Sequence, residues 1–203
     1  MHVPTVFTIS AKARVTRCAE PTQAGVTLFE LVVVILIVAI LAAVGVPTYR
    51  YVTTTSRMSS ELNGLLGDLQ YARAEAVREG QAVTVCIADS TVSPYSCASS
   101  GTTTWQNGWL VFTDVAANQT YDSSSGDTVL RVQKPFAQGG TRESNNGVGA
   151  VTFNRDGFAY LGAAQVTLTM KDSAGDAAYT RCLYLSQSGM MSTTTHLLDP
   201  NCT

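Results

Sequence analysis

The period of hydrophobic and polar positions changes twice along the chain. Residues 31–46 form an unbroken run of sixteen uncharged residues, and the polar-poor stretch is 21 residues long when it is counted from Val26. At 1.5 Å per residue a helix of that length spans about 30 Å, enough to cross the hydrocarbon core of a bilayer. The pattern therefore predicts a membrane-spanning helix over residues 26–46.

Residues 47–80 show the period of an amphipathic helix. Apolar residues recur at spacings of three and four, charged residues fill the other faces, and Gly80 suits a C-terminal end. We expect one helix to run over residues 26–79, with bends or partial melting at its proline and glycines. These helix-weakening residues are Pro47, Gly64 and Gly67. The apolar positions are Leu62, Leu65, Leu66, Leu69, Ala72, Ala76 and Val77, and the charged ones are Arg57, Glu61, Asp68, Arg73, Glu75, Arg78 and Glu79.

From residue 81 to the end, the period is two and turn residues are dense, which indicates a β-rich head. Two long loops rich in Ser, Thr and Gly, residues 89–107 and 115–127, are candidate contact loops or simple solvated linkers. The expected strands are 82–88, 109–114, 128–134, 149–154, 165–171 and 180–186.

The first 25 residues are basic, because they contain Lys12, Arg14 and Arg17 and one acidic residue, Glu20. A secretory signal is the alternative interpretation, with cleavage on the far side of the apolar run, near residues 39–43. Signal apolar regions are usually shorter than this run and directly follow their basic residues. We therefore expect a leader over 1–25 that is removed and an apolar helix that is retained.

Charge argues against a nucleic-acid partner. The whole chain has a formal net charge of −2, and without the first 25 residues it keeps ten basic and fourteen acidic side chains. A head of this kind has no overall basic field to attract nucleic acid.

One carboxylate, Glu30, lies within the apolar stretch. A carboxylate at the centre of a membrane helix costs about 2.5–3.5 kcal/mol, and less towards the interface, so it should have a partner. If the chain is cut after Gly25, Glu30 becomes the fifth residue and a new α-ammonium forms on Val26. The ammonium of a neighbouring subunit would be a suitable partner for this carboxylate.

This junction resembles the N-terminal signature of the type IV pilin and type II secretion pseudopilin superfamily. The matching residues are Gly25, Val26, Thr27, Leu28, Phe29 and Glu30, and Pro47 falls where many pilins have a helix-kinking proline. The resemblance implies cleavage between Gly25 and Val26 and N-methylation of Val26 by a prepilin peptidase. The chain departs from the pattern in having Val26 where Phe is commonest, and in the length of its leader.

The rest of the chain resembles the GspH/FimT family of minor pilins and pseudopilins. The resemblance implies an α+β, type IV pilin-like fold, in which the long N-terminal helix packs on an antiparallel β-sheet head, with Trp109 and Phe112 in the core. The residues that carry it are Ala72, Arg73, Glu75, Ala76, Gly108, Trp109, Val111, Phe112, Asp114, Val129, Leu130, Arg131, Phe153, Asn154, Asp156, Gly157, Cys182, Leu183, Leu185, Ser186 and Gly189.

Five cysteines become an even set of four once Cys18 is assigned to the leader. Four cysteines allow three connectivities, and an oxidising compartment is expected for this domain. We expect the local connectivity, Cys86 with Cys97 and Cys182 with Cys202, whose loops would each contribute about 3 kcal/mol. A metal site is the competing interpretation, but the chain has no Cys-x-x-Cys and only His196 lies outside the leader.

The chain offers no constellation for catalysis. His196 lies in a polar tail without a recognisable nucleophile motif. The glycines at 139–140 and at 147 and 149 are not followed by a helical pattern, so we interpret them as hairpin glycines and not as a phosphate cradle. No enzyme activity, cofactor or metal is expected.

The resemblance implies a minor pilin or pseudopilin, held in the bacterial inner membrane by one helix with its head in the periplasm. Its partners would be other pilin subunits, the prepilin peptidase and inner-membrane lipid, and it would prime or cap a pilus or pseudopilus. One alternative is a pseudopilin H of type II secretion, and another is an ordinary periplasmic domain on a single-pass anchor.

A third alternative is DNA uptake, because some FimT-type relatives bind DNA through a Gly-Arg-x-Arg motif. The corresponding stretch here, residues 189–192, reads Gly-Met-Met-Ser, and residues 186–203 contain neither Lys nor Arg. Because phosphate contacts dominate affinity for DNA, the sequence disfavours this role.

Overall fold

The computed structural model describes residues 25–89, 96–99, 101–136 and 140–203. The expected leader, apart from Gly25, lies outside the described residues, as do Gly139 and part of the loop expected over 89–107. The chain divides after Gly45 into two compact units, residues 1–45 and residues 46–203. We refer to the second unit as the head.

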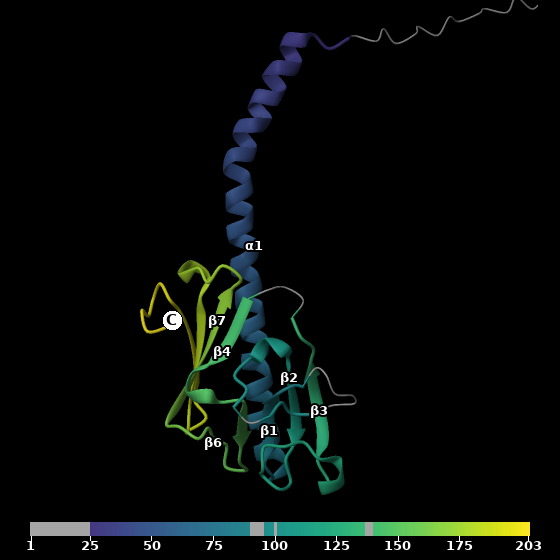
Figure 1. Cartoon of the computed structure of the whole chain (residues 1–203), viewed down its shortest axis with the longest axis vertical. Coiled ribbons are helices and arrows are strands. Elements are labelled where there is room, and N and C mark those ends of the chain that lie inside the picture. The colour runs from purple at the N-terminus through teal and green to yellow at the C-terminus, as the bar shows by residue number, and fades with distance from the viewer. Residues whose placement is uncertain (1–24, 90–95, 100, 137–139) are drawn as a thin grey trace, which may run out of the picture. The chain divides into compact units, whose positions relative to one another are not determined.

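A single α-helix, α1, spans Leu28–Glu79 and contributes to both units (Figure 1). It begins two residues later than expected and ends at the predicted position, where Gly80 adopts a left-handed φ of +71°. The helix is continuous through Pro47, Gly64 and Gly67, so the expected partial melting is wrong. The kink expected at Pro47 falls near the boundary between the two units and stays a prediction.

Two antiparallel sheets make up the β-part of the head (Figure 1). One has five strands in the order β3-β2-β1-β5-β6, and the other has four in the order β4-β7-β8-β9. The strands are β1 Val83–Ile87, β2 Trp109–Thr113, β3 Thr128–Gln133, β4 Gly140–Ser144, β5 Ala150–Phe153, β6 Ala159–Tyr160, β7 Gln165–Asp172, β8 Arg181–Ser186 and β9 Met191–Thr195. Short 3-10 helices lie at Trp105–Asn107, Ser123–Ser125, Asn145–Gly147 and Ala177–Tyr179.

All six expected strands are confirmed, each to within one residue at either end. Three further strands, β4, β6 and β9, were not expected. The sequence of β4 is polar, β6 has two residues, and β9 reads Met-Ser-Thr-Thr-Thr without apolar alternation. They form because neighbouring strands offer complete edges for pairing, with β4 on β7, β6 on β5 and β9 on β8.

The main core lies between the C-terminal part of α1 and both sheets. Leu65, Leu69 and Ala72 of the helix are fully buried, and Trp109 of β2 packs in the same cluster. Phe112 is also fully buried, but in a second cluster with Cys86 and Leu110. Both aromatic residues therefore have the core positions expected of them, on opposite sides of the five-stranded sheet.

Two disulfides brace the head. Cys86 of β1 is bonded to Cys97, and Cys182 of β8 is bonded to Cys202, with Cα atoms 5.6 and 5.7 Å apart. This is the local connectivity, and each bond fastens a segment outside the named strands to one of those strands. The second bond holds the end of the chain against β8.

Candidate functional site

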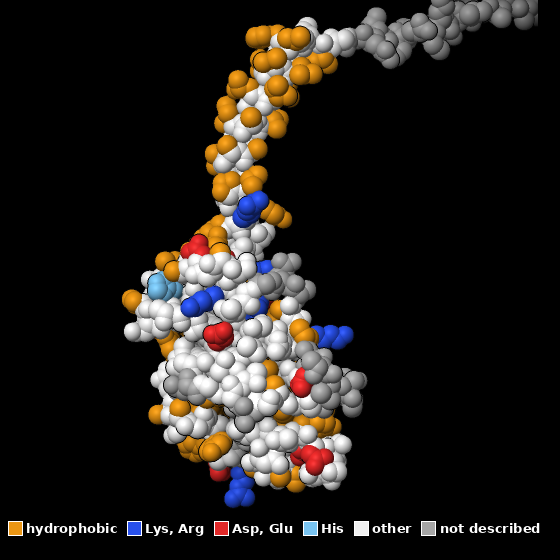
Figure 2. Space-filling view, in the orientation of Figure 1, with side chains coloured by type: hydrophobic (Ala, Val, Ile, Leu, Met, Phe, Trp, Pro, Cys, Tyr) orange, Lys and Arg blue, Asp and Glu red, His pale blue; other side chains and the backbone are white. Residues whose placement is uncertain are grey.

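The N-terminal unit presents an apolar helix that nothing in the described chain covers. Every residue from Gly25 to Arg50 is exposed, and Figure 2 shows apolar side chains along this part of α1. Among the described residues, α1 is the helix long and apolar enough to cross a membrane. Such a surface is unfavourable in water.

Glu30 lies in the first turn of this helix, which Thr27 caps. The Glu30 amide donates to Thr27 Oγ1 at 3.2 Å, and the Leu31 amide donates to the Thr27 carbonyl at 3.1 Å. Within the described residues no side chain pairs with the Glu30 carboxylate. The signature residues therefore form a capped helix start with one carboxylate available for a partner.

In the head, three charged residues of α1 point into the domain, contrary to expectation. The first is Glu61, whose Oε2 accepts from Arg142 Nε of β4 at 2.9 Å and also contacts Arg142 Nη2. Arg142 is 1% exposed and its guanidinium lies 4.5 Å from the centre of the Phe136 ring. This ion pair is buried at the junction of the helix with the four-stranded sheet.

The second inward-facing charge, Asp68, joins α1 to the five-stranded sheet. Its two oxygens accept from Trp109 Nε1 and from Arg131 Nη1, each at 2.8 Å. Arg131 also stacks on the ring of Tyr71, 3.7 Å from its centre. Trp109 is thus a core residue, and the only polar atom of its side chain has a partner.

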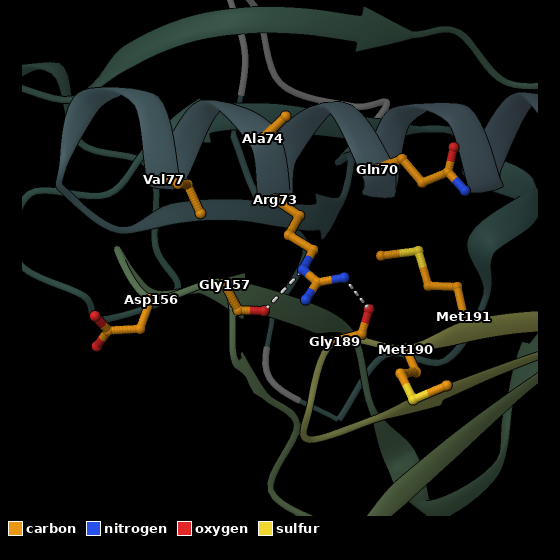
Figure 3. A pocket seen from close by; sticks show the side chains of 9 residues that line it. All are labelled: Gln70, Arg73, Ala74, Val77, Asp156, Gly157, Gly189, Met190 and Met191. Atoms are coloured by element: carbon orange, nitrogen blue, oxygen red, sulfur yellow. Dashed lines mark hydrogen bonds between the residues drawn. The ribbon is translucent and has the colours of Figure 1, made fainter.

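The third, Arg73, ties α1 to two turns of the head (Figure 3). Its guanidinium donates to the carbonyls of Gly157 at 2.9 Å, Gly189 at 3.0 Å and Ser188 at 3.3 Å. Both glycines have left-handed φ values, and a Cβ at Gly189 would lie 2.4 Å from the Gly157 carbonyl oxygen. Arg73, Gly157 and Gly189 all carry the family resemblance, and the structure brings them into one contact.

The charged positions of the amphipathic helix therefore do not all face solvent. Glu75 is 8% exposed and pairs with Arg78, whose hydrogen bond lowers the pKa of the Glu75 carboxyl. The expectation that these charged residues lie away from the core was wrong because α1 is covered on two sides by the two sheets. The strands supply partners for the inward-facing charges, such as Arg142 for Glu61. No pattern in the sequence of α1 alone identifies these partners.

A groove of about 760 Å³ opens beside the Arg73 contact. Ala74 and Val77 of α1 line it on one side and Met190 and Met191 on the other (Figure 3). Val77 is 54% exposed and Met190 is 72% exposed. The structure thus places Gly189, Met190 and Met191 at an apolar groove, and Val77, expected on the core-facing stripe, faces outward.

Of the two long loops, the one over 115–127 is held by a buried carboxylate. Asp114 accepts from Thr84 Oγ1 at 2.8 Å and from the amides of Asn118 and Gln119 at 3.0 and 2.8 Å. In the same loop, hydrogen bonds from Ser124 lower the pKa of Asp122. These contacts fasten the loop to the head through the carboxylate of Asp114.

The C-terminal segment, residues 196–203, is also held to the head by side-chain hydrogen bonds. Tyr184 of β8 donates to Asp199 at 2.7 Å, which lowers the pKa of Asp199 and raises that of Tyr184. His196 Nδ1 lies 2.8 Å from the carbonyl oxygen of Cys202. His196 therefore takes part in closing the disulfide-bonded segment.

Two protein-family descriptions match the chain. Residues 61–189 match the family described as type II transport protein GspH, and residues 21–46 match the prokaryotic N-terminal methylation motif. No curated protein matches.

Two solved structures match, both of the type IV minor pilin FimU of Pseudomonas aeruginosa strain PAO1. The crystal form in space group P21 gives a TM-score of 0.50 at 22% identity, over 69% of this chain and 87% of that one. The form in P65 gives a TM-score of 0.48 at 22% identity, over 68% and 91%. At this identity the first match shows a shared fold.

Proposed function

Because the chain belongs to the GspH family, and so is a minor pilin or pseudopilin, we propose that it is anchored in the bacterial inner membrane and drawn from there into a fibre. Its head would face the periplasm before assembly. As a minor subunit it would prime or cap the pilus or pseudopilus and have no enzymatic role.

The observation that carries this proposal is the exposed apolar part of α1 within the methylation motif. All its described residues are exposed, and it carries one acidic residue, Glu30. The proposed processing is cleavage between Gly25 and Val26 by a prepilin peptidase, with methylation of Val26. In the fibre the Glu30 carboxylate would pair with the N-terminal ammonium of an adjacent subunit.

Within the family we favour a pilus over a type II secretion pseudopilus. The supporting features are the two disulfides of the head and its Ser/Thr-rich loops. DNA uptake is disfavoured because the groove stretch carries methionines and the following residues to the C-terminus include neither Lys nor Arg.

The intact mass of the protein extracted from membranes tests the proposal. We expect the mass of residues 26–203 with two disulfides plus one methyl group, and we expect Gly25→Leu to keep its leader. Gly45→Leu, at a glycine within the same segment, should be processed normally. An N-terminus at Met1, or one near residue 43, would contradict the proposal, and so would absence of the mature protein from sheared fibres.

A further inference from the structure

Two hollows of the head meet at an exposed tyrosine, on the face of the five-stranded sheet that is turned away from α1. Their volumes are about 340 and about 570 Å³, and both linings include Tyr160 and Gly162. Tyr160 belongs to the edge strand β6, which is labelled in Figure 1. Its neighbour Ala159 is buried in the main core with residues of α1, so the Tyr160 side chain points to the opposite face.

Tyr160 and a second aromatic ring are both open to solvent at these hollows. Tyr160 is 68% exposed, and Phe158, which lines the larger hollow with it, is 57% exposed. A single exposed apolar residue needs no explanation, but two aromatic rings beside a hollow offer a ligand a large apolar contact area. This surface is therefore suited to a ligand that has an apolar face.

The polar part of both linings is uncharged. Among the described residues, neither hollow is lined by Asp, Glu, Lys or Arg. Side-chain amides are present instead, from Asn118 and Gln119 at the smaller hollow and from Asn154 and Gln187 at the larger one. Each amide offers a donor and an acceptor, which suits hydroxyl groups, whereas a charged ligand would meet no opposite charge.

Two of these amides are held in place by the fold. Gln119 has a left-handed φ of +63°, which side chains rarely allow, and its backbone amide donates to the buried Asp114 carboxylate at 2.8 Å. Its side-chain Nε2 donates to Thr152 Oγ1 at 3.2 Å. In the same way, Gln187 Nε2 donates to the Ala163 carbonyl at 3.1 Å. Fixing one end of an amide orients the other end, so less conformational entropy is lost when a ligand binds.

We propose that this surface binds a neutral oligosaccharide, with the Tyr160 ring against a sugar face and the amides on either side bonded to sugar hydroxyls. A sugar ring combines apolar C–H faces, which pack on an aromatic ring, with a rim of hydroxyls that donate and accept hydrogen bonds. Hollows of this size are typical of small-molecule sites, and two that share one wall accommodate more than one sugar unit. Such binding does not require the chain to enter a fibre.

Saturation-transfer difference NMR on the full chain tests this inference. The protein is kept in a detergent without a sugar head group. The neutral probes are N-acetylchitotetraose, cellotetraose and maltotetraose, and tetragalacturonate is the charged comparison. We expect at least one neutral probe to bind with a Kd of about 1 mM or tighter, and tetragalacturonate to bind about tenfold more weakly or not at all. Failure of all three neutral probes to bind, or equal binding of tetragalacturonate, would overturn the inference.

Substitutions at the surface give a second measurement. Tyr160→Ala should weaken binding of the best neutral probe about tenfold, because it removes the ring on which the sugar packs. Tyr49→Ala is the matched control, since Tyr49 is 70% exposed but lies on α1, outside both linings. It should leave the Kd unchanged. If Tyr160→Ala binds as tightly as the unmodified chain, or if Tyr49→Ala weakens binding equally, the proposed site is wrong.

A glycine substitution separates the loss of an amide from damage to the loop. Gln119→Gly removes the side-chain amide, and glycine adopts the left-handed backbone without strain. We expect weaker binding of the neutral probe, with thermal unfolding still cooperative by circular dichroism. Unchanged affinity in this variant would show that the amide does not contact the ligand and would also overturn the inference.

Discussion

Single polar residues decide how the helix joins the sheets of the head. Glu61, Asp68 and Arg73 each bond to a different part of the domain: to β4, to β2 with β3, and to two turns. Their directional bonds fix the rotation and register of the helix, which apolar packing alone fixes less strictly. The most buried of them is the pair of Glu61 with Arg142, with side chains 9% and 1% exposed.

Removing one member of this pair should destabilise the head strongly. Glu61→Leu leaves the Arg142 guanidinium without its carboxylate, and breaking a buried pair in this way costs about 3–5 kcal/mol. The double variant Glu61→Leu with Arg142→Met replaces both charges by apolar groups and should recover most of that loss. Unfolding of the full chain in detergent, followed by the fluorescence of the buried Trp105 and Trp109, measures both. Equal loss of stability in the single and double variants would contradict this account.

At the scale of elements, strong periodicity predicted structure well and weak periodicity did not. The helix end at Glu79 and the six strands that contain several apolar residues are where the sequence places them. Strands β4 and β9 escaped prediction because their residues are polar and pairing with β7 and β8 stabilises them.

In the candidate site, too, residues that form a local sequence pattern could be predicted, and residues brought together only by the fold could not. Gly25, Val26 and Glu30 could be chosen from their spacing along the chain, because the signature is local in sequence. The groove could not, because it joins residues near 75 to residues near 157 and 190. Arg73 and Gly189 are 116 residues apart, and neither has a local pattern that indicates the other.

Two glycines in α1, Gly64 and Gly67, lie at positions where the structure of the head has room for a side chain. A Cβ at Gly64 or Gly67 would meet nothing within 4 Å, and neither residue has a positive φ. Gly64→Ala and Gly67→Ala should therefore each stabilise the head by about 0.5–1 kcal/mol, the usual cost of glycine in a helix. Gly189→Ala is the opposite control, since its φ is +74° and its Cβ would clash with Gly157, so it should destabilise. Urea unfolding of the full chain in detergent gives all three values, and a loss of stability in both helix variants would refute the prediction.

At the scale of the whole molecule, the chain combines two units that differ in whether they bury their own apolar side chains. Residues 1–45 bury none of their described side chains within the monomer, whereas the head has its own core and two disulfides. The first unit therefore depends on lipid or on other subunits, and the second does not. Changes near Glu30 should affect assembly and leave the folding of the head unchanged.

Glu30→Gln tests this separation and the proposed subunit contact together. The substitution keeps the shape of the side chain and removes its charge, so insertion into the membrane and cleavage after Gly25 should proceed normally. In the fibre, the ammonium of the adjacent subunit would be left unpaired at low dielectric. A cost of about 3 kcal/mol corresponds to a roughly hundredfold lower recovery of the variant in sheared fibres. Glu30→Asp, which keeps the carboxylate, should lose less. Fractionation shows where each variant stays, and intact mass shows whether it was processed. If Glu30→Gln reaches fibres in normal amounts, the carboxylate is not the assembly contact, and the contacts of the head must account for recruitment.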